Sequence, residues 1–90
     1  MKIKFFATYR EITRRKEEDF PAPENMRELL NNLCERYPGF REKLLTPDGM
    51  EVGGETIIMV NGRNIDHLDG IKTPLAETDT VSVFPVVAGG

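Results

Sequence analysis

Hydrophobic and polar residues alternate near both ends of the chain, a pattern typical of half-buried β-strands. The first such segment spans residues 2–8 and places three apolar side chains on one face: Ile3, Phe5 and Ala7. The last spans residues 80–84 and directs Val81 and Val83 toward one face, so that Phe84 points the other way. The pattern therefore predicts a strand at each end of the chain, each with one face in the core.

A helical period replaces the alternation within the first half. Six residues recur at intervals of three and four: Met26, Leu29, Leu30, Leu33, Cys34 and Tyr37. They predict an amphipathic helix that begins either with Pro23 in its first turn or with Asn25 as its N-cap, three residues before Glu28. Pro38 and Gly39 then end the helix.

Turn-rich segments connect the remaining elements. The polar stretch 14–19 is too hydrophilic to bury, so we expect it at a hairpin tip and along an outer strand. Residues 56–60 form an apolar, β-rich run that ends in Asn61-Gly62, a dipeptide suited to the positive φ angles of a tight hairpin turn. Residues 63–65 would return as a short strand.

The predicted order is strand, strand, helix, strand, short strand, strand. A single sheet packed on one main helix fits this order and buries the helical stripe. We therefore expect an α+β fold of the β-grasp (ubiquitin-like) type, with a mixed sheet of four to five strands whose first and last strands run parallel at the centre. The 90 residues would form one domain, 1–90. Residues 85–90 would leave the sheet as a flexible tail, because Pro85 lacks a ladder donor.

Composition narrows the class of partner. Twelve Lys and Arg against fifteen Asp and Glu give a net charge of −3, unlike the cationic surface that nucleic acid requires. The acidic excess lies in the second half and suits a partner with a basic docking surface. A single cysteine excludes an internal disulfide framework and indicates a reducing compartment. With no signal peptide or membrane-spanning run, we expect a cytoplasmic protein that binds neither membrane nor nucleic acid.

The side chains before the C-terminal tail do not form a recognisable catalytic or metal-binding site in the sequence. Cys34 lies in the helical stripe and is expected to be a buried, inert thiol. His67 lacks a second histidine or a cysteine beside it, so no metal site is expected. Asp66 and Asp69 flank a turn and should shape it rather than act as a carboxylate pair. Gly53-Gly54 lacks the following Lys-Ser/Thr of a phosphate-binding loop and is interpreted as a flexible loop.

Several motifs resemble those of one known family: Val60-Asn61-Gly62-Arg63, Leu68-Asp69-Gly70, Thr73-Pro74-Leu75, Asp79-Thr80-Val81 and Phe84-Pro85-Val86-Val87-Ala88-Gly89-Gly90. The stretches 6–12 and 35–39 extend the likeness over nearly the whole chain. The chain resembles the ubiquitin-like sulfur carriers of the MoaD/ThiS family, most closely the small subunit of molybdopterin synthase. It departs from the family pattern at Val86, where a second proline is more usual, and at Arg14, where glycine is common.

The resemblance implies a sulfur carrier, and not an enzyme with its own catalytic residues. An E1-like adenylyltransferase would use ATP to activate the carboxyl group of Gly90, and a sulfurtransferase or cysteine desulfurase would supply the sulfur of a thiocarboxylate. Activation is needed because a terminal carboxylate is an anion at neutral pH and a poor electrophile. Gly89 and Gly90 would let the tail enter a narrow tunnel. The molybdopterin synthase large subunit would then use the sulfur to build the dithiolene that ligates molybdenum or tungsten. The carrier itself would bind no cofactor.

Side-chain parity indicates where such partners dock. If Val81 and Val83 face the helix, Phe84 faces outward, and Phe6 does so on the neighbouring strand. An exposed aromatic pair beside the tail would suit binding of the activating enzyme and the large subunit, unless one ring packs under a loop. The rest of the expected partner-binding segment follows along the chain: Pro85, Val86, Val87 and Ala88.

The sequence leaves three other functions open. A ubiquitin-like modifier would use the same activated Gly90 to form isopeptide bonds with lysines. A sulfur carrier could also serve thiamine synthesis or tRNA thiolation. A plain β-grasp interaction module would carry an incidental Gly-Gly end.

Overall fold

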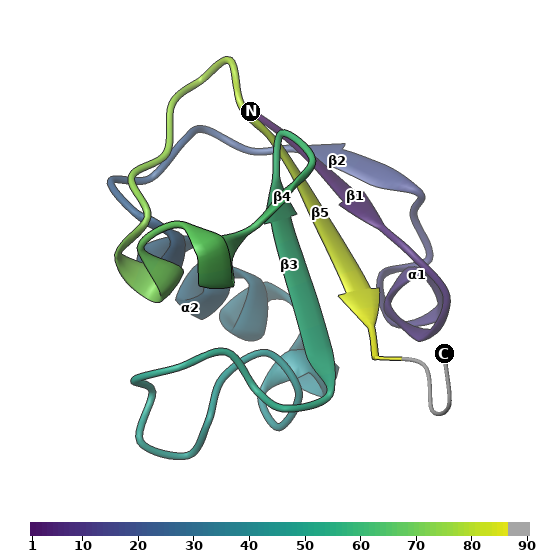
Figure 1. Ribbon diagram of the computed structural model, residues 1–90. Coiled ribbons are helices and arrows are strands. Elements are labelled where there is room, and N and C mark those ends of the chain that lie inside the picture. Colours follow the sequence, from purple (N-terminus) through teal and green to yellow (C-terminus); the bar gives the residue numbers. More distant parts are fainter. Residues whose placement is uncertain (87–90) are drawn as a thin grey trace.

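The computed structural model describes residues 1–86, which form a five-stranded sheet in the order β2-β1-β5-β3-β4. Its strands are β1 (Lys2–Phe5), β2 (Glu17–Asp19), β3 (Thr56–Val60), β4 (Arg63–Asn64) and β5 (Thr80–Pro85). β1 and β5 run parallel at the centre, and the other neighbouring pairs are antiparallel (Figure 1). The prediction of a β-grasp fold with a mixed sheet is confirmed.

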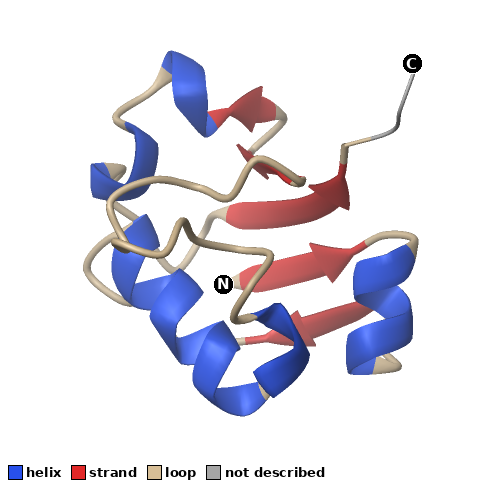
Figure 2. Cartoon of the chain, turned by 90° about the horizontal axis from the view of Figure 1, so that it is seen from below, coloured by secondary structure: helices blue, strands red, loops and turns tan. Residues whose placement is uncertain are grey.

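One main helix, α2 (Met26–Arg36), begins at Asn25 and not at Pro23. The Asn25 side chain accepts a hydrogen bond from the Glu28 N–H at 3.0 Å, and the Glu28 carboxylate accepts one from the Glu24 N–H at 2.9 Å. The first bond satisfies a donor that the first helical turn leaves free, and the second joins that turn to the residue before the cap. Figure 2 shows the helical segments other than α1 (Thr8–Thr13) grouped to one side of the strands.

The core lies between α2 and the sheet face that the alternation predicted to be buried. Ile3, Phe5, Val81 and Val83 have no exposed surface. They pack with the apolar stripe of α2, which consists of Met26, Leu29, Leu30, Leu33 and Cys34. The period-two pattern of the strands and the helical period therefore describe two sides of the same core.

The first connection differs from the predicted hairpin. The strand expected over residues 2–8 ends at Phe5, and α1 lies between β1 and β2. Ala7 has a φ of 53° and is exposed, which corrects its predicted place on the buried face. Arg14 ends α1 with a φ of 61°, the left-handed conformation that glycine adopts most readily.

The polar stretch after α1 is not wholly exposed. Its residues Glu17–Asp19 form the outer strand β2, as predicted, but Glu18 is only 7% exposed. The Arg36 guanidinium lies 2.6 Å from one Glu18 oxygen, and the Tyr37 hydroxyl donates to the other at 2.7 Å. A buried carboxylate with two such partners is tolerated, and this corrects the expectation that the whole stretch stays in solvent.

Three short 3₁₀ segments complete the chain: η1 (Pro38–Phe40), η2 (Ile65–His67) and η3 (Gly70–Lys72). Between β3 and β4, Asn61 and Gly62 have φ angles of 51° and 84°, so the tight turn is confirmed. The return strand is shorter than predicted, because Ile65 begins η2. No helix within residues 1–86 combines the length and apolar character needed to span a bilayer.

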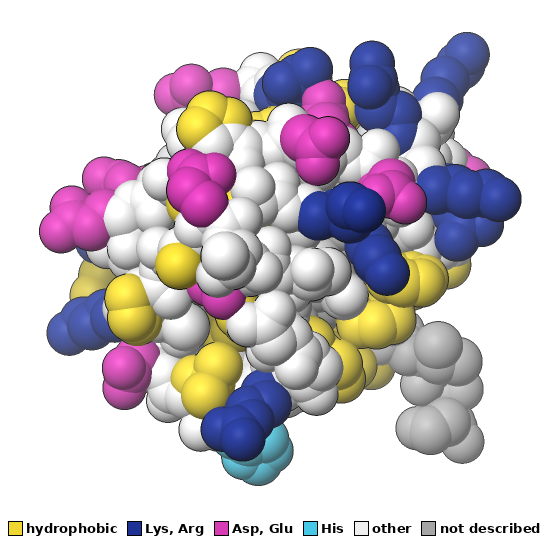
Figure 3. All heavy atoms as spheres, turned by 90° about the horizontal axis from the view of Figure 1, so that it is seen from above, with side chains coloured by type: hydrophobic (Ala, Val, Ile, Leu, Met, Phe, Trp, Pro, Cys, Tyr) yellow, Lys and Arg dark blue, Asp and Glu magenta, His cyan; other side chains and the backbone are white. Residues whose placement is uncertain are grey.

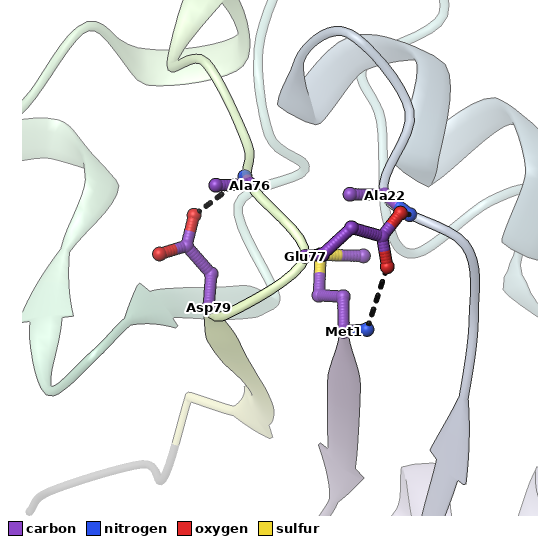
Figure 4. Close-up of polar contacts among 5 residues, drawn as sticks. All are labelled: Met1, Ala22, Ala76, Glu77 and Asp79. Atoms are coloured by element: carbon purple, nitrogen blue, oxygen red, sulfur yellow. Dashed lines mark hydrogen bonds and ion pairs between the residues drawn. The ribbon is translucent and has the colours of Figure 1, made fainter.

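At the start of β1, Glu77 connects three segments (Figure 4). Its carboxylate lies 3.3 Å from the Met1 amino nitrogen and accepts a hydrogen bond from the Ala22 N–H at 2.7 Å. In the same turn, Asp79 accepts a bond from the Ala76 N–H at 2.8 Å. This polar cluster stands at one end of the sheet, and β5 ends at the opposite end (Figure 1).

Candidate docking surface and tail base

β5 continues one residue further than predicted. Pro85 is its last residue and pairs with Thr56, and the Val86 N–H donates to the Glu55 carbonyl at 2.8 Å. Pro85 and Val86, which were expected to be the first residues of the tail 85–90, are therefore still joined to the sheet. Proline is tolerated because alternate residues of β5 point their backbone groups toward β1, as the Val83 carbonyl does, and β1 has already ended beside Pro85.

The two aromatic side chains predicted to face outward lie against each other. The ring centroids of Phe6 and Phe84 are 4.5 Å apart, and the ring planes differ by 12°. Phe84 follows the buried Val83 in β5, whereas Phe6 follows β1 and donates its N–H to the Val83 carbonyl at 3.1 Å. Both rings are half-buried, so the predicted adjacency is present, and part of each ring is covered by its partner.

Neighbouring strands extend this pair into a larger apolar surface, which we call the open-face patch: Phe6, Ile57, Met59, Phe84 and Val86. In the antiparallel ladder Ile57 lies opposite Phe84, and Met59 lies opposite Ser82. Cross-strand partners share a face, so both β3 side chains lie beside the aromatic pair. Val86 continues the alternation and is 51% exposed. Hydrophobic side chains also gather near Lys and Arg side chains along one margin of the face seen in Figure 3.

The charge next to the patch is positive on the β1 side. Lys4 lies opposite Ser82 and is exposed, and Lys2 lies one step further along the same face. The Lys2 ammonium is 3.0 Å from the Glu17 carboxylate, whose hydrogen bond raises the pKa of Lys2. The expected acidic docking character therefore does not extend to this part of the sheet.

A small cavity of about 370 Å³ adjoins the end of β5. Its lining residues come from α1, the loop before β3 and the end of β5: Thr8, Tyr9, Lys43, Gly54, Glu55, Pro85 and Val86. At its edge the Lys43 ammonium lies 3.5 Å from the Glu55 carboxylate. Below it the Tyr9 hydroxyl is 2.5 Å from Thr56 Oγ1. Tyr9 was not predicted as a site residue, and the only sequence signal for it was its spacing of three and four from Ile12 and Thr13.

The other residues considered in the sequence analysis lie in the core or in surface turns. Cys34 is 7% exposed, and burial raises the pKa of its thiol, as expected for an unreactive side chain. His67 is exposed at the end of η2. Asp66 and Asp69 lie in the turns around η2 and η3, where their backbone N–H groups donate to Asn64 Oδ1 at 2.9 Å and to Thr73 Oγ1 at 3.2 Å. Within residues 1–86, no group of three or more His, Cys, Asp or Glu side chains could hold a metal ion.

Gly53 is packed more tightly than a flexible loop would require. It is buried, its N–H donates to the Leu44 carbonyl at 3.0 Å, and a Cβ at this position would lie 2.3 Å from the Lys43 carbonyl oxygen. Gly53 therefore permits a close backbone approach, which corrects the flexible-loop interpretation for this residue. Four of the predicted site residues, Val87, Ala88, Gly89 and Gly90, lie outside the described residues.

The β-grasp sheet and the motifs along the chain both point to one protein family. The model of the ThiS family matches residues 3–90 of the chain. The chain belongs to the ThiS family. The resemblance inferred from the motifs is therefore confirmed, and the match includes the C-terminal residues.

Individual relatives of this ThiS-family chain are named as modifier proteins, as molybdopterin synthase subunits or as other sulfur carrier proteins. Small archaeal modifier protein 3 of Haloferax volcanii is 38% identical over 100% of this chain and 98% of its own. A molybdopterin synthase sulfur carrier subunit of Emericella nidulans is 30% identical over 98% of this chain and 94% of its own. The solution structure of small archaeal modifier protein 1 from Methanosarcina acetivorans has a TM-score of 0.84 and 31% identity, over 99% of this chain and 94% of that one. The chain is thus a member of the ubiquitin-like sulfur carrier family.

Proposed function

We propose that this protein carries sulfur on its C-terminal carboxyl group as the small subunit of molybdopterin synthase. The observation that carries the proposal is the family match, which runs through residue 90, together with relatives named molybdopterin synthase sulfur carrier subunit over 98% of the chain. In this role the protein is a cosubstrate, and its partners provide the catalytic residues.

The chemistry assigned to Gly90 proceeds in three steps. An E1-like enzyme transfers AMP from ATP to the carboxylate, and pyrophosphate leaves. The terminal sulfur of a persulfide on a sulfurtransferase or cysteine desulfurase then attacks the acyl carbon, and AMP leaves to give an acyl disulfide. A thiol reduces this disulfide and releases the thiocarboxylate. Adenylation is needed because the carboxylate anion is a poor electrophile and oxide is a poor leaving group.

The open-face patch supports this function because it adjoins the base of the tail. A partner that binds Phe6 and Phe84 would hold the end of β5 close to its own active site. Apolar and aromatic side chains that become buried in the middle of an interface contribute most of its affinity. The same surface would serve the activating enzyme and the synthase large subunit in turn, so that binding of the two would be mutually exclusive.

Sulfur loading of a Gly90 deletion variant tests the proposal. Wild-type protein incubated with the activating enzyme, ATP and a sulfur source should gain the mass difference between sulfur and oxygen, as measured by intact-protein mass spectrometry. The deletion variant should gain no mass and should keep its thermal midpoint, because residue 90 follows the end of β5 by five positions in the sequence. Equal mass gain in both proteins would place the sulfur elsewhere and overturn the proposal.

A second candidate function is protein modification, favoured by the 38% identity to small archaeal modifier protein 3. A lysine amine and a sulfide are alternative nucleophiles toward the same acyl-adenylate, so one activated Gly90 could serve both. Immunoblots of cells that express tagged wild-type protein should show slower-migrating conjugates if this function operates, and the Gly90 deletion should remove them. A ladder that persists in the deletion variant would exclude isopeptide formation through Gly90.

A further inference from the structure

We propose that Tyr9 is a positioning residue that fixes the direction in which the C-terminal segment leaves the sheet. Tyr9 acts through Thr56, which begins β3 beside the end of β5, and through the preceding residue Glu55. The effect on sulfur loading rests on the proposed function, whereas the effect on the local structure does not.

The start of β3 needs support from outside the sheet. On one side β3 pairs with β5 along its whole length, but on the other β4 reaches only Met59 and Val60. Thr56 therefore has no β4 partner in the described structure. A strand end with one free edge frays easily unless other groups satisfy and hold its backbone.

A chain of hydrogen bonds supplies this support. Thr56 Oγ1 donates its only proton to the Lys43 carbonyl at 2.6 Å. The Tyr9 hydroxyl, 2.5 Å away, must therefore be the donor to Thr56 Oγ1. Tyr9 is 1% exposed and its ring packs edge-on against Phe40, at a centroid distance of 5.4 Å. The donor is thus held by the core, and it fixes the Thr56 side chain on the buried face of the sheet.

The backbone next to Thr56 forms the last bond of the ladder. The Glu55 carbonyl accepts the Val86 N–H at 2.8 Å, and the Tyr9 hydroxyl lies 3.5 Å from the same carbonyl oxygen. Val86 is the last residue before the four C-terminal positions. Any movement of Glu55 would therefore change the point and direction at which those residues begin.

The orientation of the carboxyl group matters for activation, because adenylation requires it to reach the α-phosphate of ATP in a narrow range of positions. Once the activating enzyme has bound the open-face patch, the position of the carboxyl group still depends on how firmly the tail base is held. Tyr9 is therefore expected to influence turnover more than docking affinity.

The test compares Tyr9→Phe with Tyr37→Phe. Each variant loses one phenolic hydroxyl and keeps the ring, but the Tyr37 hydroxyl donates to Glu18 in β2, away from the tail base. In Tyr9→Phe, amide exchange of Val86 measured by NMR should accelerate about tenfold, the factor associated with one lost hydrogen bond. Turnover of adenylation should fall by a similar factor, while the dissociation constant for the activating enzyme stays within about twofold. Tyr37→Phe should leave all three quantities unchanged.

Thr56 provides a second pair of variants. Thr56→Val removes the hydroxyl with little change in shape and should accelerate Val86 exchange as Tyr9→Phe does. Thr56→Ser keeps the hydroxyl and should exchange at Val86 at the wild-type rate. The proposal is overturned if Tyr9→Phe leaves Val86 exchange unchanged, if Tyr37→Phe accelerates it equally, or if faster exchange leaves turnover unaffected. Failure of wild-type protein to be adenylated would overturn the proposed function instead, and the exchange data would still decide whether Tyr9 fixes the tail base.

Discussion

Arg14 occupies a backbone conformation that does not suit its side chain. Its φ of 61° places an L-residue in the left-handed region, which costs about 1–2 kcal/mol relative to the right-handed region. Glycine avoids most of this cost but loses more entropy on folding, by about 0.5–1 kcal/mol. The glycine that the resemblance leads us to expect at this position would thus have a physical explanation.

Arg14→Gly should therefore stabilise the fold by about 0.5–1 kcal/mol, because relief of the left-handed strain exceeds the added entropy loss. Urea unfolding of the wild type and the variant measures the difference. Arg15→Gly is a matched control, since Arg15 is equally exposed and has no positive φ. It should not be stabilised. A gain in the control, or none at Arg14, would contradict this explanation.

Cys34 is the only thiol of the chain, but its position argues against a role in sulfur transfer. Burial raises its pKa, so the reactive thiolate is disfavoured in the folded state. Cys34→Ser should still accept sulfur at the C-terminus, although a buried hydroxyl without a partner would lower the stability by about 1–3 kcal/mol. Intact mass after sulfur loading decides the matter. A folded variant that gains no sulfur would show that the thiol takes part.

At the scale of elements, the sequence predicted helices and strands best where the hydrophobic pattern ran over many residues or was supported by a second signal. The stripe of α2 spans three turns and carries a capping residue at Asn25, and the alternation around Val81 and Val83 coincides with full burial. By contrast, α1 has six residues, too few for a helical period to stand out from the preceding alternation. Its position depends on the turn at Ala7 and on tertiary contacts of Tyr9, which local pattern does not contain.

The candidate site shows the same division. Parity alone brought Phe6 and Phe84 together, because strand alternation and a parallel central pair determine which residues share the open face. The tail base could not be predicted in this way. It combines α1, the loop at Lys43 and the start of β3, and such long-range hydrogen bonds leave no periodic signal in the sequence.

The loop before β5 carries a pH-dependent contact. Hydrogen bonding from Ala22 and the adjacent Met1 ammonium lower the pKa of Glu77. A carboxyl group with a lowered folded-state pKa stabilises the fold above its unfolded pKa, and this contribution disappears as the pH falls through the folded value.

Glu77→Gln should therefore melt at a lower temperature than the wild type at pH 7, and the difference should shrink toward zero as the pH falls through the lowered folded-state pKa of Glu77. Thermal melts across this pH range provide the measurement. Glu35→Gln removes the same charge from the exposed side of α2 and serves as the control. A Glu77→Gln deficit that is constant with pH would show that packing, and not ionisation, is responsible.

At the scale of the whole molecule, the two ends of the sheet differ in the kinds of side chains that they bring together. The end that holds Glu77 connects the start of β1 to the loop before β5 through charged and backbone groups. At the opposite end the open-face patch adjoins the tail base, so that under the proposed function docking and presentation of the tail would share one edge of the fold. In a domain of 90 residues, a binding surface on the sheet face needs no enclosed cleft and leaves the core intact.

Phe84→Arg tests this arrangement most directly. Removal of an aromatic side chain from the centre of an interface costs about 2 kcal/mol or more, and a charge placed in its pocket costs at least as much, so affinity for the synthase large subunit should fall about 30-fold or more. The fold should lose less, chiefly the stack with Phe6, which is worth about 0.5–1.5 kcal/mol. Phe6→Arg should behave alike, since the rings form one surface.

Titration calorimetry and a thermal melt of each variant separate the two effects. Met50→Arg is the matched control: Met50 is an exposed apolar residue, 54% accessible, in the loop before β3 and outside the open-face patch. It should bind the large subunit as the wild type does, because an added arginine away from the interface changes only long-range electrostatics, which salt screens. If Phe84→Arg binds normally, or if Met50→Arg weakens binding as much, the open-face patch is not where the large subunit docks.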